Sequence, residues 1–488
     1  MADRTVSTVE QLTAAARDPS VRRIEVRGAI TGAPTLRLAP GQRLVGTADG
    51  AVVAFADGVD GVRLTRDNEL VRIGLRVLPE RRAVYTEPDA QDVEGVGDLG
   101  TLRLARVATV GQVQLLAGDR VRAGHVVVDG LDVVAADLRG RAERPTLSGV
   151  GALQGAFTLW VRQPDAAVTV TAELRGISAG RDGAPVRGSG VLIAGAPGAG
   201  GRLEVGELET GPIVTDGGIA EGSHDTISGG VFVVFGAHVA AVRNRGPVTT
   251  HGVNDMALDN WGAVDRWTAQ APVTSYGRSG VGFVNFGTIG ALRVAAPIQT
   301  HGVGARGFNV YRLEGDAGPT VQTAEFDRID TNADAAVGIQ IGQPIGRLIV
   351  HHGVHTRGGA GDSLVKGVIT RLLAHALSVR PGGSIGSVEV GGALTSTGPA
   401  VVTVEIRGQV VTMRVGGGIH ARGAGSDALY VDAGGRLGLR ETEVTAEDGA
   451  AIRLARRTGA ELHDVWAHGS RGDVVVDPVD PAAGAPVG

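Results

Sequence analysis

The chain has 488 residues, a formal net charge of −5 and no cysteine. Without a concentrated basic stripe it offers no electrostatic case for nucleic acid or for an anionic membrane surface. Without cysteine it has no disulfides, thiol nucleophile or thiolate metal site. Glycine reaches 78 residues and aromatic residues only 3%, while apolar residues make up 43%. This composition favours many short strands separated by glycine turns.

Residues 1–22 predict an N-terminal capping helix. Ser7, with Glu10 three residues later, has the pattern of a capping box at the start of a short amphipathic helix. The opening "MADRTVSTVEQL" contains no apolar run typical of a signal peptide, and no stretch approaches the length of a membrane span. We therefore expect a cytoplasmic protein without a membrane partner.

A repeated motif then organises the chain. An apolar residue, a small or polar pair and usually a glycine recur as "VTTHG", "VTSYG" and "IQTHG", with later copies that vary more. The motif begins at residues 248, 273, 298, 329, 354, 394, 419 and 444, so five of the seven intervals are 25 residues. Each unit holds three short apolar strands with period-two alternation. This pattern predicts an all-β fold, a single right-handed parallel β-helix with 25-residue rungs.

The predicted β-helix covers residues 23–476 and is most regular over 248–470, and residues 477–488 form a Pro/Gly/Ala-rich tail. The opening strands "RRIEVRGAITG", "LRLAPGQRLVG" and "AVVAFADG" follow the capping helix. Over residues 5–77 this arrangement resembles the entry of right-handed β-helix proteins of the pectate-lyase-like superfamily. The resemblance implies polysaccharide lyase, hydrolase or epimerase chemistry. The family's "WIDH"-type motif, calcium-binding aspartates and Arg-x-Pro-Arg context are absent, so its calcium-dependent mechanism is not transferred to any residue.

Equivalent positions of successive rungs stack at about 4.8 Å, so the repeat predicts columns of neighbours. Ten residues after each motif start lies an apolar column, which we assign to the core. One and three residues further on lie columns that alternation points outward. They supply the candidate substrate-binding residues, which are Trp261, Phe286, Tyr311, Asn309, Gln340, Arg407 and Tyr430. Aromatic faces beside amides and charged groups suit a sugar chain lying along the helix. The alternative is stacking that supports a loop or an oligomer interface.

Four residues are candidate catalytic groups. Lys366 is the only lysine of the chain; it follows the expected core residue Leu364 and precedes a 15-residue insertion, where solenoids tend to place function. As a base it would need a depressed pKa; the alternative is a strand-end lysine that reaches solvent. Asp259, Glu405 and His301 complete the set as acid or base candidates.

The sequence predicts neither a cofactor nor a bound metal. The nearest metal-like group is "VHHGVH", which holds His351, His352 and His355, and histidines at rung corners are the simpler interpretation. Two functional hypotheses remain open at this point. One is a carbohydrate-active protein that binds, and cleaves or epimerises, an oligosaccharide or polysaccharide. The other is a non-catalytic scaffold that binds protein or glycan or assembles as a homo-oligomer.

Overall fold

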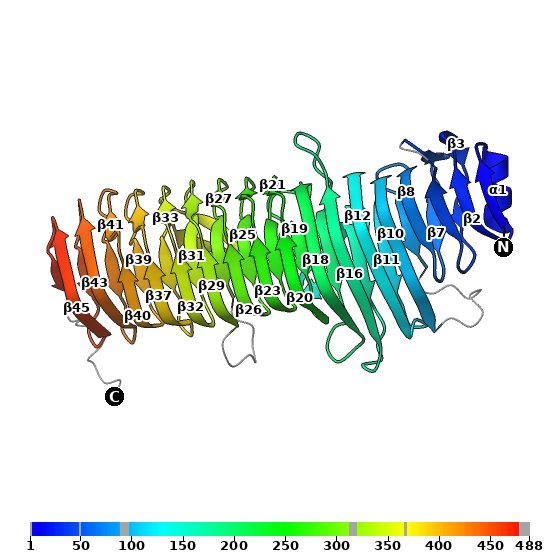
Figure 1. The fold of residues 1–488 in the computed structure, drawn as a ribbon. Helices are drawn as coiled ribbons and strands as arrows, with labels where there is room; N and C mark the ends of the chain where they lie inside the picture. Colours follow the sequence, from blue (N-terminus) through cyan, green and yellow to red (C-terminus); the bar gives the residue numbers. More distant parts are fainter. Residues whose placement is uncertain (1, 48–49, 88–96, 312–319, 366–367, 478–488) are drawn as a thin grey trace, which may run out of the picture. The chain divides into compact units, whose positions relative to one another are not determined.

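The computed structural model describes residues 2–47, 50–87, 97–311, 320–365 and 368–477. Within these residues the chain forms one α-helix and 46 β-strands, almost all of them paired in parallel with a strand of the next rung (Figure 1). The fold is a parallel β-helix, as the 25-residue repeat predicts. It comprises two compact units, Met1–Gly280 with Gly287–Gly290, and Val281–Phe286 with Ala291–Gly488.

The first unit opens with strand β1 (Ala2–Val6) and helix α1 (Val9–Arg17). The helix begins one residue later than the predicted capping box, because Thr8 is the N-cap and its hydroxyl accepts a hydrogen bond from the Gln11 amide at 3.3 Å. Leu12 and two alanines of the helix are buried against the first rung, and this covers the interior of the coil there. The predicted capping helix is therefore confirmed. Its nine residues are too few to cross a membrane, and the described part of the chain holds no other helix.

The first unit has two rows of strands, which we call sheet A and sheet B. Sheet A contains β1, β2 (Val21–Val26), β3 (Ala29–Ala33), β5 (Arg43–Gly46), β6 (Val52–Phe55), β8 (Glu69–Arg76), β10 (Asp98–Val110), β12 (Ala123–Ala135), β16 (Thr169–Ala179), β18 (Arg202–Thr215), β20 (Ala237–Asn244), β21 (Val248–Thr250), β23 (Ala263–Ala269) and β24 (Val273–Ser275). Sheet B contains β4 (Leu36–Arg37), β7 (Val62–Leu64), β9 (Arg82–Thr86), β11 (Gln112–Ala117), β13 (Thr146–Leu147), β14 (Val150–Ala152), β15 (Gly155–Val161), β17 (Ser189–Ala194), β19 (Thr226–Val233) and β22 (Asp255–Asn260).

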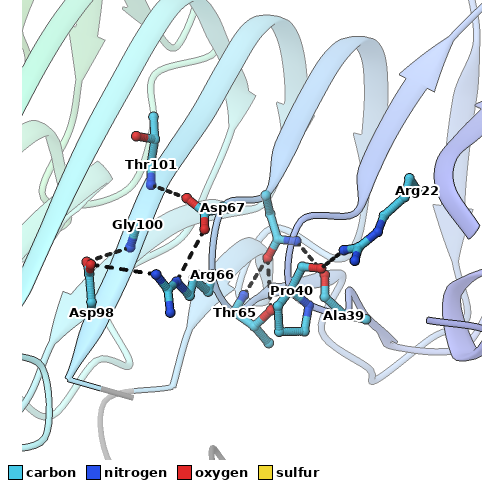
Figure 2. A network of polar contacts seen from close by, with 10 residues as sticks. Arg22, Ala39, Pro40, Thr65, Arg66, Asp67, Asp98, Gly100 and Thr101 are labelled. Atoms are coloured by element: carbon cyan, nitrogen blue, oxygen red, sulfur yellow. Dashed lines mark hydrogen bonds and ion pairs between the residues drawn. The ribbon is translucent and has the colours of Figure 1, made fainter. Parts of the chain in front are cut away.

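Side chains at the corners join successive rungs of the first unit. Figure 2 shows Arg22 donating to the Pro40 carbonyl at 2.6 Å, and the Asp67 carboxylate accepting from the Thr101 amide at 2.9 Å. Gly100 allows that second contact, because a Cβ added there would lie 2.0 Å from the Asp67 Oδ1 atom and the glycine has a φ of +59°. The corner therefore admits only glycine without rearrangement.

In the second unit, sheet A contains β27 (Ile298–Thr300), β29 (Val321–Phe326), β30 (Ile329–Thr331), β32 (Pro344–Val350), β33 (Gly353–Thr356), β37 (Ser384–Val390), β38 (Ala393–Ser396), β40 (Gln409–Val415), β41 (Ile419–Ala421), β43 (Arg436–Ala446) and β45 (Gly459–Gly469). Sheet B contains β25 (Val281–Asn285), β28 (Arg306–Val310), β31 (Val337–Ile341), β36 (Leu377–Val379), β39 (Val404–Ile406), β42 (Leu429–Val431), β44 (Ile452–Leu454) and β46 (Val474–Val476). Strand β26 (Thr288–Val294) lies where the two units are divided.

The core of the second unit follows the predicted apolar column. Phe283 pairs with Phe308, and Phe308 pairs with Ile339, and all three side chains are buried. The two phenylalanine rings meet edge to face with centroids 6.1 Å apart. Alternation along each strand therefore buries one apolar face in every rung, which is why a 25-residue spacing fixes the pairing register.

The largest departure from the predicted rungs is a hairpin in the second unit. Strands β34 (Ala360–Val365) and β35 (Val368–Leu373) pair antiparallel with each other and leave the parallel stack. Strand β36 takes the stacked position, and its Leu377 pairs with Ile339 on one side and Val404 on the other. The prediction that Leu364 continues the core column is wrong, because the insertion precedes the stacked strand instead of following it.

Candidate functional site

The strands of sheet B in the second unit end at one corner and place six residues in a column there. The residues that directly follow β25, β28, β31, β36, β39 and β42 are Phe286, Tyr311, Gly342, Arg380, Arg407 and Asp432. From Tyr311 onward, the amide of each donates to a carbonyl at the end of the preceding strand, at 2.8 to 3.1 Å. These bonds fix the six residues at equivalent positions of successive rungs. We call this set the corner column.

Two aromatic rings begin the corner column. Phe286 and Tyr311 stack with centroids 4.8 Å apart and planes inclined by 21°, and both side chains are half-buried. Trp261, the third predicted member of this platform, belongs to the first unit and is only 8% exposed. The Phe235 ring stacks against it at 6.4 Å. Trp261 directly follows β22, but Phe232 and Phe235 of the preceding rung cover its indole, so it offers no exposed aromatic face.

The middle residues of the sheet B strands form the adjacent column, which was also predicted to face outward. Asn309 is fully buried, Gln340 is 7% exposed and Glu405 is 4% exposed. The register places Ser378 between Gln340 and Glu405. Of the predicted binding and catalytic residues, Gln340, Glu405 and Arg407 are therefore brought together, and Asn309 lies one rung away within the wall.

The β34–β35 hairpin lies over these rungs. The Ser363 hydroxyl donates to the Gly304 carbonyl at 2.6 Å, and a Cβ added to Gly304 would lie 2.6 Å from the Ser363 Cβ atom. Leu372 of the second hairpin strand packs with Ala335 and Val337 of the wall. The hairpin is thus attached by both a hydrogen bond and apolar packing.

A pocket of about 200 Å³ lies beside the hairpin. Its lining residues are Val337, Gln340, Arg371, Leu372, Leu373, His375, Ser378, Arg380, Glu405 and Arg407. Three arginines and one glutamate give it an excess of positive charge when His375 is neutral. Such a pocket favours an anionic group of a ligand.

Glu405 is the centre of the polar contacts in this pocket. Its Oε1 atom accepts from the Arg407 Nε atom at 2.9 Å, and its Oε2 atom accepts from the Ser378 hydroxyl at 3.0 Å. A second guanidinium, that of Arg380, lies 3.9 Å from Oε2. The carboxylate is buried, yet both of its oxygens accept hydrogen bonds from charged or hydroxyl donors.

His375 lies beside this carboxylate. Its Nδ1 atom lies 2.6 Å from the Val402 carbonyl oxygen, and a carbonyl only accepts, so Nδ1 carries a proton. Its Nε2 atom lies 3.7 Å from the Glu405 Oε2 atom. Burial lowers the pKa of His375 below its ordinary value, against the opposing influence of Glu405. A neutral ring therefore presents the Nε2 lone pair, a proton acceptor, in the pocket.

The other predicted residues lie elsewhere. Asp259 is fully buried in β22 of the first unit, and burial raises the pKa of its carboxyl well above the ordinary value, with the Trp261 indole acting in the opposite direction. His301 is an exposed corner residue. Tyr430 lies in the rung after Glu405, and its hydroxyl donates to Asp432 at 3.2 Å. Lys366 lies outside the described residues, so its role stays a prediction.

Two of the three histidines contact separate carboxylates. His351 contacts Glu325 at 2.9 Å and His352 contacts Asp327 at 2.7 Å, while His355 is half-buried on β33. Across the described residues, no three His, Asp or Glu side chains lie together as a metal site would require. His351 and His352 thus pair with neighbouring carboxylates of the rungs.

The sequence alone assigned no binding or catalytic role to Ser378, Arg380 or His375. The signal that identifies these residues was present in the sequence. Several stacked strands read apolar, polar, apolar, as in Ile339–Gln340–Ile341 and Val404–Glu405–Ile406, and "LSV" at 377–379 fits that triplet. The segment at 364–366, "LVK", does not fit it.

Comparison with models of protein families, with curated proteins and with solved structures finds no match to this chain. The fold and the pocket geometry therefore carry the functional argument.

Proposed function

We propose that this protein binds an acidic oligosaccharide or polysaccharide along the corner column of the second unit. The observation that carries the proposal is the order of residues in that column. A stacked aromatic pair, Phe286 and Tyr311, is followed by Gly342 and then by Arg380 and Arg407 at the pocket. An apolar platform and a cationic subsite are thus two rungs apart, about 10 Å along the stack.

Each part of the column matches one feature of an acidic sugar chain. Aromatic faces pack against the C–H groups of a pyranose ring, and guanidinium groups form paired hydrogen bonds with a carboxylate. Gly342 presents no side chain between the two parts, so a chain can pass from one to the other. Gln340 adds an amide at the floor of the pocket.

The resemblance to the pectate-lyase-like superfamily supports the same class of ligand, and cleavage or epimerisation would then involve Glu405 and His375. The competing proposal is a non-catalytic scaffold that only binds the chain. One observation favours binding without turnover: the Glu405 carboxylate is already engaged by Ser378 and Arg407. Analysis of the sugar products after incubation separates the two, since new chain ends or epimers require turnover.

Calorimetric titration with uronate oligosaccharides and with neutral ones of equal length tests the proposal. We expect uronates to bind, Tyr311→Ala to weaken binding about tenfold and Arg380→Gln to remove the preference for uronates. Tyr276→Ala is the matched control, because Tyr276 is 49% exposed and stacks on His251 at a different corner, in the first unit. Equal affinity for both classes of sugar, or an equal loss with Tyr276→Ala, would overturn the proposal.

A further inference from the structure

Among the described residues, the last sheet A strand of the second unit is long and has a neighbouring strand on one side only. Strand β45 has 11 residues and, within the described part of the chain, pairs only with β43 (Figure 1). The inward residues of β43 are buried, but their partners on β45, such as Leu462 and Val465, are half-exposed. On the outer face of the same strand Trp466 is 64% exposed, and Val474 and Val476 of β46 are exposed as well. An apolar strand edge of this kind favours pairing with another strand.

The hydrogen bonds of β45 show which residues face this edge. The Gly459 amide donates to Gly435 and the Ser470 amide donates to Ala446, so these ends of the strand point toward β43. Backbone direction alternates along a strand, and Asp464 interrupts the alternation in the middle with a φ of +51°. Ala460, Leu462, Val465 and Ala467 therefore turn their N–H and C=O groups to the open edge.

The strand is self-complementary. The bend at Asp464 leaves five residues on each side, so two copies related by a two-fold axis through the bend can pair antiparallel. Consider the register that sets Leu462 opposite Ala467. The backbone groups of both residues are turned to the open edge, and the side chains of both lie on the inner face of the strand. On the outer face this register sets Glu461 opposite His468 and His463 opposite Trp466. No like charges thus meet among these four outward residues, and the exposed Asp464 lies opposite Val465.

We propose that this protein forms a symmetric homodimer through antiparallel pairing of β45 with β45 of a second copy. Pairing with β45 of a second copy is favoured over head-to-tail stacking, because Leu12 and two alanines of helix α1 already cover the apolar interior of the first rung. The dimer brings the half-exposed inward residues of the two last rungs together. The inference does not depend on the ligand proposed for the corner column.

A charge-swap experiment on the full chain tests the pairing. The side chains of Glu461 and His468 are 76% and 87% exposed, so their replacement leaves the rungs intact. We expect sedimentation equilibrium to show a dimer for the wild type. His468→Glu would place two glutamates opposite each other at both ends of the interface and weaken the dimer about tenfold. The double variant Glu461→Lys/His468→Glu restores opposite charges and should recover dimerisation.

A backbone variant and a control complete the test. Ala467→Pro removes one edge-facing N–H group without removing a bond to β43, and we expect a monomer. Val411→Lys changes an exposed apolar residue, 67% exposed, on a strand with neighbours on both sides, and should leave the dimer unchanged. A monomeric wild type, an unaffected His468→Glu variant or a double variant that fails to recover would each overturn the proposal.

Discussion

The two units bury acidic side chains in opposite ways. In the first unit, Asp255 and Asp259 are fully buried on β22, and no arginine contacts either carboxyl among the described residues. In the second unit, Glu405 is almost as deeply buried but has two arginines, a serine and a histidine around it. Burial penalises a charge in both units, but only Glu405 of the second unit has arginines beside its carboxylate.

This difference distinguishes a carboxyl group that only packs within the wall, Asp255, from one that lines a pocket, Glu405. Asp255 accepts hydrogen bonds from the Gly252 amide and the Thr215 hydroxyl within the wall. Glu405 has its charge compensated at the boundary of a pocket. A buried carboxylate is therefore a functional candidate here only where cations and open volume accompany it.

The largest predicted effect concerns Asp255. Burial raises the pKa of its carboxyl to about 7, well above the unfolded value, so the folded state holds a proton that the unfolded state has lost between about pH 4 and 7. This contribution to stability therefore falls as pH rises through that window and is constant above it. Asp255→Asn should gain stability relative to the wild type from pH 4 to pH 8, by at most about 4 kcal/mol.

Urea unfolding followed by tryptophan fluorescence measures this effect, because Trp160, Trp261 and Trp267 all belong to the first unit. Thr215→Val is a control that removes a hydroxyl donor but keeps the carboxyl. A stability difference between Asp255→Asn and wild type that is the same at every pH would contradict a raised pKa.

The second prediction is that removing the buried acid of the second unit destabilises the protein, whereas replacing Asp255 stabilises it. Glu405→Ala leaves the guanidinium groups of Arg380 and Arg407 near one another without their carboxylate, and we expect a loss of about 3 kcal/mol of unfolding free energy. Amide hydrogen exchange of β36 and β39 measures this locally. Ser378→Ala, which removes one neutral donor, should cost about 1 kcal/mol. A stabilised Glu405→Ala variant would mean that Glu405 resembles Asp255.

The third prediction concerns the hairpin that lies over the pocket. Gly304 has a φ of +71°, and an added Cβ would collide with Ser363 and the Asp362 carbonyl. Gly425 has a similar φ of +65° with open space around it. We expect Gly425→Ala to cost about 1 kcal/mol, from backbone strain alone, and Gly304→Ala to cost about twice that. Equal costs would show that the hairpin moves freely on the wall.

The fold could be predicted because the sequence pattern that encodes it repeats at a fixed interval. The 25-residue spacing fixes the rungs, the alternation fixes the core column, and Gln340, Glu405 and Arg407 follow as neighbours in adjacent columns. Phe286 and Tyr311 were found in the same way. Their stacking depends only on equivalent positions in successive rungs.

The rest of the site depends on irregularities that no periodicity encodes. Placing the insertion after Leu364 instead of before Leu377 removed Ser378 and Arg380 from the columns. The alternation of side chains along a strand predicts that Trp261 is exposed. It does not predict contacts at the corner, where the Phe235 ring covers the indole. The pocket itself exists only because the hairpin lies back over the wall, a tertiary contact made through Ser363 and Leu372.

The smallest predicted effect is a pH dependence opposite to that of Asp255. Burial lowers the pKa of His375, so below about pH 6.5 the unfolded state binds a proton that the folded state does not. The second unit should therefore lose stability as pH falls from 7 to 5. His375→Asn keeps a donor for the Val402 carbonyl but cannot titrate. Its stability relative to the wild type should rise by roughly 1 kcal/mol over that range.

Scanning calorimetry at pH 7, 6 and 5 compares the wild type with the His375→Asn variant. The control is His301→Asn, a change at an exposed corner. A wild-type stability that increases as pH falls would contradict the prediction. If the wild type gains stability toward pH 5, then His375 is protonated in the folded state and pairs with Glu405, whose Oε2 atom lies 3.7 Å from Nε2. The pocket would then carry one more positive charge and would lack a proton acceptor on the histidine. Binding of an acidic sugar would still be favoured, but chemistry that starts from a neutral imidazole would not.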